Sequence, residues 1–107
     1  ELPPADFEHS NWHMFQPLLP AVLPSHVPHR GAFIEAMREH GIGVGVHYPA
    51  MHLFSLYRSY GHREGEFPHA ERIGQRTVTL PLFPAMRDDD IERVCAALQS
   101  VMQGHPS

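Results

Sequence analysis

The chain contains no lysine, and all eight of its basic residues are arginine. Chemistry that requires an ε-amine, such as Schiff-base formation with a carbonyl compound, depends on a lysine side chain as the nucleophile. This chain therefore cannot carry out such chemistry alone. The exclusion limits which enzymatic roles are open to it.

Cysteine, positive charge and long apolar runs are also scarce. Cys95 is the single cysteine, which excludes an intrachain disulfide and fits a reducing compartment. The net charge of −4 offers no basic stripe, so we expect neither nucleic-acid nor membrane-surface binding. No run approaches the roughly 18 apolar residues of a membrane-spanning helix, and no signal-peptide pattern opens the sequence. These features together predict a cytoplasmic location.

The bulk composition is that of an ordinary soluble globular domain. Its 107 residues are enough for one domain with a single small core, and 42% of them are hydrophobic. Eleven prolines are a high count, and they cluster at 3–4, 17–28 and 81–84. This clustering indicates extended connections between elements rather than disorder.

Residues 41–52, with the sequence GIGVGVHYPAMH, are the most informative stretch. Gly43 and Gly45 alternate with valines, which suits a strand with one face close to another surface. Pro49 lacks a backbone donor, so the ladder of a sheet is expected to stop there. His47 and Tyr48 then lie at the exit of the strand, where a polar ring pair is well placed to meet a ligand.

Hydrophobic periodicity and turn residues predict the order strand, helix, strand, helix, helix, strand, helix. The strands are too far apart for hairpins, so we expect an α+β fold: a small, mostly antiparallel sheet with helices packed on one face. The last helix has the strongest pattern, because three aspartates favour its amino end and an apolar stripe follows. The predicted ranges are 12–19, 30–40, 42–48, part of 50–61, 68–75, 77–82 and 88–103.

The ordered set of these segments resembles the C-terminal small domain of the DegT/DnrJ/EryC1/StrS family of pyridoxal-phosphate-dependent sugar aminotransferases. The resemblance covers roughly residues 12–103, with 1–11 as a lead-in segment and 12–107 as the small domain. The matching residues are WHMF at 12–15, Arg30, FIEAM at 33–37, GIGVGVHYP at 41–49, His52, ERI at 71–73, LPLFP at 80–84 and the acidic helix start before Ile91.

The resemblance implies an enzyme that moves an amino group from an amino acid, usually glutamate, to a keto group of a nucleotide-activated sugar. In that family a large N-terminal domain carries the Schiff-base lysine and most contacts to pyridoxal 5'-phosphate, and the intact enzyme is expected to be a homodimer. The missing lysine agrees with a chain that lacks this cofactor domain. We therefore expect no catalytic residue and no bound cofactor in this part of the enzyme.

The resemblance also places the strand exit near the mouth of the active-site cleft. His47, Tyr48 and His52 are accordingly the predicted substrate-binding residues, because a neutral imidazole or phenol can hydrogen-bond a sugar hydroxyl or a diphosphate oxygen. The alternative is structural: His47 and Tyr48 end the strand and pack against the absent domain. The residues alone leave both readings open.

Other polar residues are assigned mainly structural roles. His13 is predicted to be a buried, hydrogen-bonded histidine of the first strand, although a site role stays open. Arg72 could clamp a phosphate, but pairing with Glu71 or Glu66 on a helix surface is favoured. Cys95 falls on the apolar stripe of the last helix and is predicted to be a core residue.

The ten histidines raise the question of a metal site. His9 and His13 are four apart, but they lie in a lead-in and a strand, where this spacing does not place both rings on one helix face. The pairs at 26 and 29 and at 47 and 52 lack a third ligand at a convincing spacing. No metal site is therefore predicted.

Two other functions remain open from the sequence. One is a stand-alone ligand- or protein-binding module that reuses the small-domain fold, and the other is a small metal-dependent hydrolase. The first reading, a non-catalytic part of an aminotransferase, further predicts an exposed apolar face that a partner domain would cover.

Overall fold

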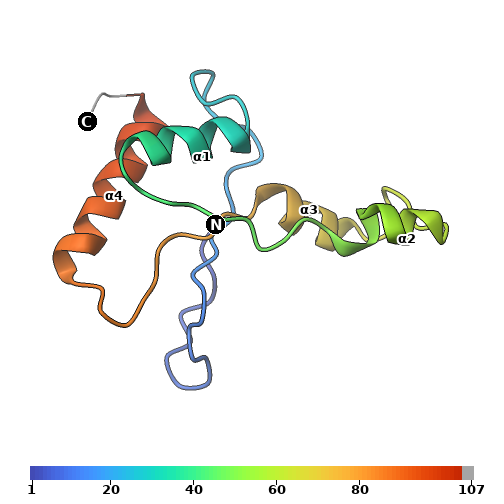
Figure 1. Cartoon of the computed structure of the whole chain (residues 1–107), viewed down its shortest axis with the longest axis horizontal. Coiled ribbons are helices and arrows are strands. Elements are labelled where there is room, and N and C mark those ends of the chain that lie inside the picture. Colours follow the sequence, from blue (N-terminus) through green and yellow to red (C-terminus); the bar gives the residue numbers. More distant parts are fainter. Residues whose placement is uncertain (105–107) are drawn as a thin grey trace.

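The computed structural model describes residues 1–104 of the chain. Helices α1 and α4 lie against each other, while α2 and α3 extend away from them as an arm (Figure 1). The end of the predicted domain, 105–107, lies outside the described residues. The helical elements are α1 (Arg30–Glu39), the 3₁₀ turn η1 (Met51–Leu53), α2 (Ser55–Ser59), α3 (Pro68–Arg76) and α4 (Asp88–Gln103).

The predicted sheet is wrong for the described part of the chain. Three extended segments, 15–19, 43–47 and 77–80, run beside one another, but none of them forms a β-strand. They are joined by isolated antiparallel bridges between Phe15 and Leu80, Leu18 and Thr77, and Gly45 and Thr79. The α+β class with helices on one face of a sheet is therefore replaced by a helix-rich fold with irregular extended segments.

Proline explains why the pairing stays irregular. The amide of Val78 donates to the carbonyl of Pro17 at 3.1 Å, but Pro17 has no N–H with which to return a bond. On the other side, Gly45 and Thr79 exchange both backbone bonds, at 3.1 and 2.8 Å. Pro49 and Pro81 follow within a few residues, so neither pairing extends into a ladder.

The core lies where α1 and α4 face the segment 77–80. Phe33 and Met37 of α1 are fully buried, and Val78 is almost so. The predicted helices over 30–40 and 88–103 are confirmed to within one residue. Cys95, predicted to be in the core, is instead exposed. The buried face of α4 is formed by Val94, Ala97 and Val101, and one residue further along a helix turns the side chain by about 100°.

The carboxyl-terminal half of α3 is held by the start of α1 and by the chain at residues 49–50. The guanidinium of Arg30, at the start of α1, donates from Nη1 to the carbonyl oxygens of Gly74 at 2.6 Å and of Thr77 at 3.2 Å. Carbonyls at a helix C-terminus lack partners within the helix and carry negative partial charge, so a cation stabilises them. Gly74 also lies directly on the chain at Pro49 and Ala50.

A buried carboxylate organises the arm. Glu71 of α3 accepts backbone hydrogen bonds from Gly65 at 2.8 Å and from Phe67 at 3.2 Å, which closes the loop between α2 and α3. The imidazole of His52 in η1 lies 3.4 Å from the same carboxylate and packs edge-on against the Phe67 ring. The Gly65 amide holds the pKa of Glu71 below its ordinary value, although burial acts in the opposite direction.

The arm makes the molecule extended. Its radius of gyration is 15.6 Å, whereas a compact domain of this length would have about 13 Å. Large apolar side chains remain on the surface, including Phe7 at 83% and Tyr60 at 71% exposed. Among the described residues, no helix is both long and apolar enough to cross a bilayer. The shape leaves much apolar surface without a covering layer.

Replacing Gly74 with alanine is expected to destabilise the chain. A Cβ at this position would lie 2.5 Å from the backbone nitrogen of Ala50, which cannot move without shifting the chain after His47. Helix propensity favours alanine by about 1 kcal/mol, yet we expect a net loss of roughly 1–2 kcal/mol in the free energy of unfolding because of the clash. Urea unfolding followed by circular dichroism measures it.

Gly43→Ala is the matched control for that variant. A Cβ there meets nothing within 4 Å, so its stability is expected to lie between no change and about 1 kcal/mol of gain. Equal unfolding midpoints for the two variants would contradict the close approach of α3 to residues 49–50.

The lowered pKa of Glu71 predicts how stability depends on pH. A carboxyl group with a lower pKa when folded adds stability above its unfolded pKa, ordinarily 4.5, and this contribution disappears as pH falls through the folded value. Glu71→Gln should therefore lose stability relative to wild type at pH 7, and the difference should shrink below pH 4.5. Urea midpoints across this range test the linkage, with Glu92→Gln at an exposed position of α4 as control. A pH-independent difference would refute it.

Candidate functional site

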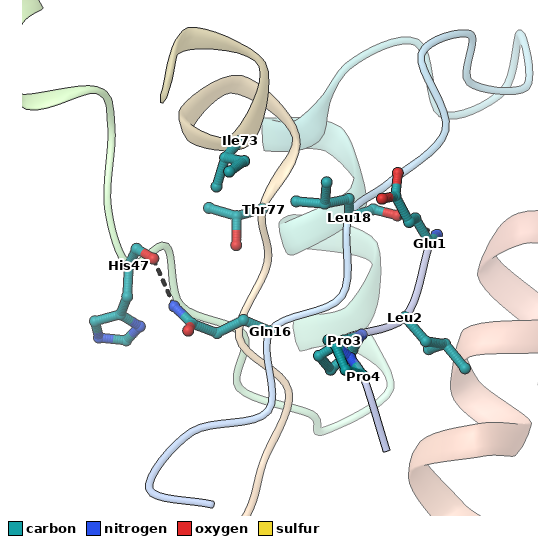
Figure 2. A pocket seen from close by; sticks show the side chains of 9 residues that line it. All are labelled: Glu1, Leu2, Pro3, Pro4, Gln16, Leu18, His47, Ile73 and Thr77. Atoms are coloured by element: carbon teal, nitrogen blue, oxygen red, sulfur yellow. Dashed lines mark hydrogen bonds between the residues drawn. The ribbon is translucent and has the colours of Figure 1, made fainter. Parts of the chain in front are cut away.

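An open cleft of about 280 Å³ lies beside the strand exit that the sequence singles out. Four separate stretches of chain meet there: the amino-terminal residues, the segment at 16–18, the chain at His47 and the end of α3 (Figure 2). Its walls are mainly apolar, with a few polar groups among them. The lining residues are Glu1, Leu2, Pro3, Pro4, Gln16, Leu18, His47, Ile73 and Thr77.

His47 is held by both its backbone and its ring. The side-chain amide of Gln16 donates to the His47 carbonyl oxygen at the edge of the cleft (Figure 2). The imidazole is turned to the other side of the chain, away from Ile73 and Thr77 (Figure 2). There its Nδ1 lies 2.7 Å from the hydroxyl oxygen of Thr79. The backbone of His47 therefore lines the cleft, whereas its imidazole ring lies next to the cleft.

Gly45 provides the space for this ring. Side chains two residues apart on an extended segment point to the same face, so position 45 lies beneath the imidazole. A Cβ at Gly45 would come within 3.0 Å of the His47 Cε1 atom. The sequence predicted that these glycines face a nearby surface. At Gly45 the neighbour is the His47 ring of the same chain, whereas a Cβ at Gly43 would meet nothing within 4 Å.

Tyr48 continues the site outside the cleft. Its side chain is 66% exposed, and its ring meets that of His47 edge-on, with centroids 4.8 Å apart and an angle of 84° between the planes. This arrangement is a favourable one for two aromatic rings. The pair leaves an imidazole and a phenol side by side at the rim, both able to hydrogen-bond a neutral or anionic oxygen.

His52 does not join this pair. It is only 8% exposed and lies in the arm against Glu71 and Phe67. Its Nε2 faces the carboxylate at 3.4 Å without the geometry of a hydrogen bond. The sequence therefore predicted three residues for one site, and the structure brings two of them together and places the third behind them in the arm.

Other candidates occupy places that differ from those expected. His13 is exposed rather than buried, because the segment around it is a loop and not part of a sheet. Arg72 pairs with the Glu1 carboxylate at 2.8 Å rather than with Glu71 or Glu66. Within residues 1–104, no group of three His, Cys, Asp or Glu side chains is arranged to hold a metal ion.

Sequence reasoning missed the residues that hold His47. Gln16 and Thr79 come from segments 31 and 32 residues away, and neither belongs to a recognisable motif. A partial signal exists for Thr79, because Thr77 and Thr79 alternate with Val78 and Leu80. Such alternation places the two threonines on one face of an extended segment. It does not tell which neighbour that face meets.

Comparison with known families gives one match that spans most of the chain. The DegT/DnrJ/EryC1/StrS aminotransferase family matches residues 2–99. Two curated proteins are similar at 36% identity. One is the uncharacterized protein MJ1066 of Methanocaldococcus jannaschii, over 85% of this chain, and the other is the spore coat polysaccharide biosynthesis protein SpsC of Bacillus subtilis, over 70%.

Solved structures show the same fold. The putative sugar aminotransferase Spr1654 of Streptococcus pneumoniae, in its PMP-form, superposes with a TM-score of 0.74 at 21% identity over 86% of this chain. PseC of Helicobacter pylori, an aminotransferase involved in the biosynthesis of pseudoaminic acid, gives 0.74 at 15% identity over 86% of this chain. The aminotransferase TlmJ of Streptoalloteichus hindustanus gives 0.66 at 27% identity over 85% of it.

The matched region is a small part of each relative. It spans 23% of the Methanocaldococcus protein, 20% of SpsC, 22% of Spr1654, 24% of PseC and 22% of TlmJ. The chain therefore corresponds to a fragment of these proteins in length. The match over residues 2–99 shows that this chain belongs to the DegT/DnrJ/EryC1/StrS aminotransferase family.

Proposed function

We propose that this chain is the C-terminal small domain of an enzyme that transfers an amino group from glutamate to the keto group of a nucleotide-activated sugar. The observation that carries the proposal is the family match over residues 2–99, in a chain whose His47–Tyr48 pair lies at the rim of an open cleft. Relatives described as sugar aminotransferases or as polysaccharide biosynthesis proteins support the class of substrate.

A pyridoxal phosphate cofactor belongs to this proposal, but the residues of this chain do not fit it. Without a lysine the chain cannot bind an aldehyde cofactor covalently. The cleft also lacks a cluster of cationic side chains for a phosphate group, since its lining holds no arginine. We therefore assign the cofactor to the part of the enzyme that lies outside this chain, and we assign no reaction step to the residues described.

What this chain can supply is shape and neutral hydrogen bonding. His47 and Tyr48 present an imidazole and a phenol that can bond sugar hydroxyls or diphosphate oxygens without carrying a fixed charge. His52, buried between Phe67 and Glu71, is proposed to act through the arm, by keeping the chain after Tyr48 in place. The apolar side chains left on the surface support contact with a cofactor domain and with a second subunit of a homodimer.

The direct test is amino transfer by the longer protein that carries this chain. With ¹⁵N-glutamate and a set of nucleotide-linked keto sugars, we expect labelled amino sugar from the longer protein. The 107-residue chain alone is expected to give no product and no cofactor absorbance, because it has no lysine. Turnover by the chain alone, or none by the longer protein with any keto sugar, would refute the proposal.

Variants at the rim test the residue roles. In the longer enzyme, His47→Ala and Tyr48→Phe are each expected to raise KM for the sugar nucleotide by roughly threefold to tenfold, the loss of one net hydrogen bond. The kcat should change less, because these contacts bind substrate and transition state alike. His69→Ala, at an exposed position of α3, is the matched control. Unchanged KM in both rim variants would favour the structural reading of this pair.

A further inference from the structure

We infer that Thr79 and Gly45 are positioning residues that fix the orientation of the His47 imidazole for substrate binding. This inference rests on the proposed function, in which His47 meets the sugar nucleotide, and it goes beyond that function by naming what aims the ring. Neither residue is proposed to touch the substrate. Both would act through His47.

The first observation is the hydrogen bond between the two side chains. His47 Nδ1 and the Thr79 hydroxyl oxygen are 2.7 Å apart, and the site is partly shielded from water. A hydroxyl can donate or accept, so it can satisfy either neutral tautomer of the ring. In both cases Nδ1 is occupied, and Nε2 has no hydrogen-bond partner among the described residues. The bond therefore selects which ring nitrogen is left for a ligand.

The second observation is steric and independent of the first. The ring that reaches Thr79 lies over position 45, where a Cβ would approach Cε1 to 3.0 Å and the Thr79 Cβ to 3.9 Å. A side chain at position 45 would therefore push the imidazole away from the hydroxyl. Glycine contributes space for the ring at this position rather than an unusual backbone conformation.

The third observation concerns the separation between the segment that carries His47 and the segment that carries Thr79. Gly45 and Thr79 exchange backbone hydrogen bonds in both directions, at 3.1 and 2.8 Å. This bridge sets the two segments at one separation, while the Gln16 amide restrains the His47 carbonyl from the opposite side. His47 is thus held at its backbone and at Nδ1, and its ring packs against that of Tyr48.

The bond can be tested in the full 107-residue chain without substrate. With ¹⁵N-histidine labelling, the His47 signals are assigned as those lost in His47→Gln. We expect Thr79→Val to move the His47 Nδ1 shift toward that of free histidine, while Thr79→Ser keeps the wild-type shift. Gly45→Ala should move the shift as Thr79→Val does. Unchanged His47 shifts in Thr79→Val would overturn the inference.

Kinetics in the longer enzyme separate this inference from the proposed function. Thr79→Val is expected to raise KM for the sugar nucleotide roughly threefold to tenfold, with kcat less affected and with rescue in Thr79→Ser. If His47→Ala leaves KM unchanged, the substrate role of His47 fails, although the ring geometry still stands on the spectra. If His47→Ala raises KM while Thr79→Val moves the shift but not KM, the positioning role is refuted.

Discussion

The segment from Thr77 to Leu80 is the structural element on which the other parts depend. Its backbone is bonded to residues 15–19 on one side and to Gly45 on the other, while Val78 is buried in the core. Because Pro17 cannot return a bond and Pro81 ends the segment, the pairing stays at single bridges. The bridge between Gly45 and Thr79 therefore aligns the chain that carries His47, without help from a continuous ladder.

The two halves of the molecule meet at this segment. The Arg30 guanidinium bonds the carbonyls of Gly74 and Thr77, so the body formed by α1 and α4 is connected to the carboxyl end of α3. From there α3 lies on the chain at residues 49–50, and Glu71 and His52 hold the remaining arm. The position of Tyr48 thus depends on α3 packing, whereas that of His47 depends on the bridge.

Sequence patterns predicted the helices well and the extended segments poorly. Phe33 and Met37 repeat at helical spacing, and the three aspartates before Ile91 mark the start of α4, so local signals were sufficient. The sheet was wrong because residues 12–19 were predicted to form a strand although they contain Pro17. This proline lies within the pairing and cannot return a backbone bond to it. The family was identified correctly from ordered short segments. The partners of His47 could not be found, because Gln16 and Thr79 meet it only through tertiary pairing.

The chemistry of the rim follows from this architecture. Arg72, the cation nearest in sequence to the cleft-lining Ile73, is paired with the Glu1 carboxylate, and the lining itself includes no arginine. At this cleft, charge therefore contributes little to ligand binding. Specificity for a ligand has to come from neutral hydrogen-bonding groups whose orientation is fixed. A hydrogen bond from a ring held at several points loses little conformational entropy when a ligand binds. Under the proposed function, such a wall would select among sugars by hydroxyl geometry, while charge and covalent chemistry are assigned to the part of the enzyme outside this chain.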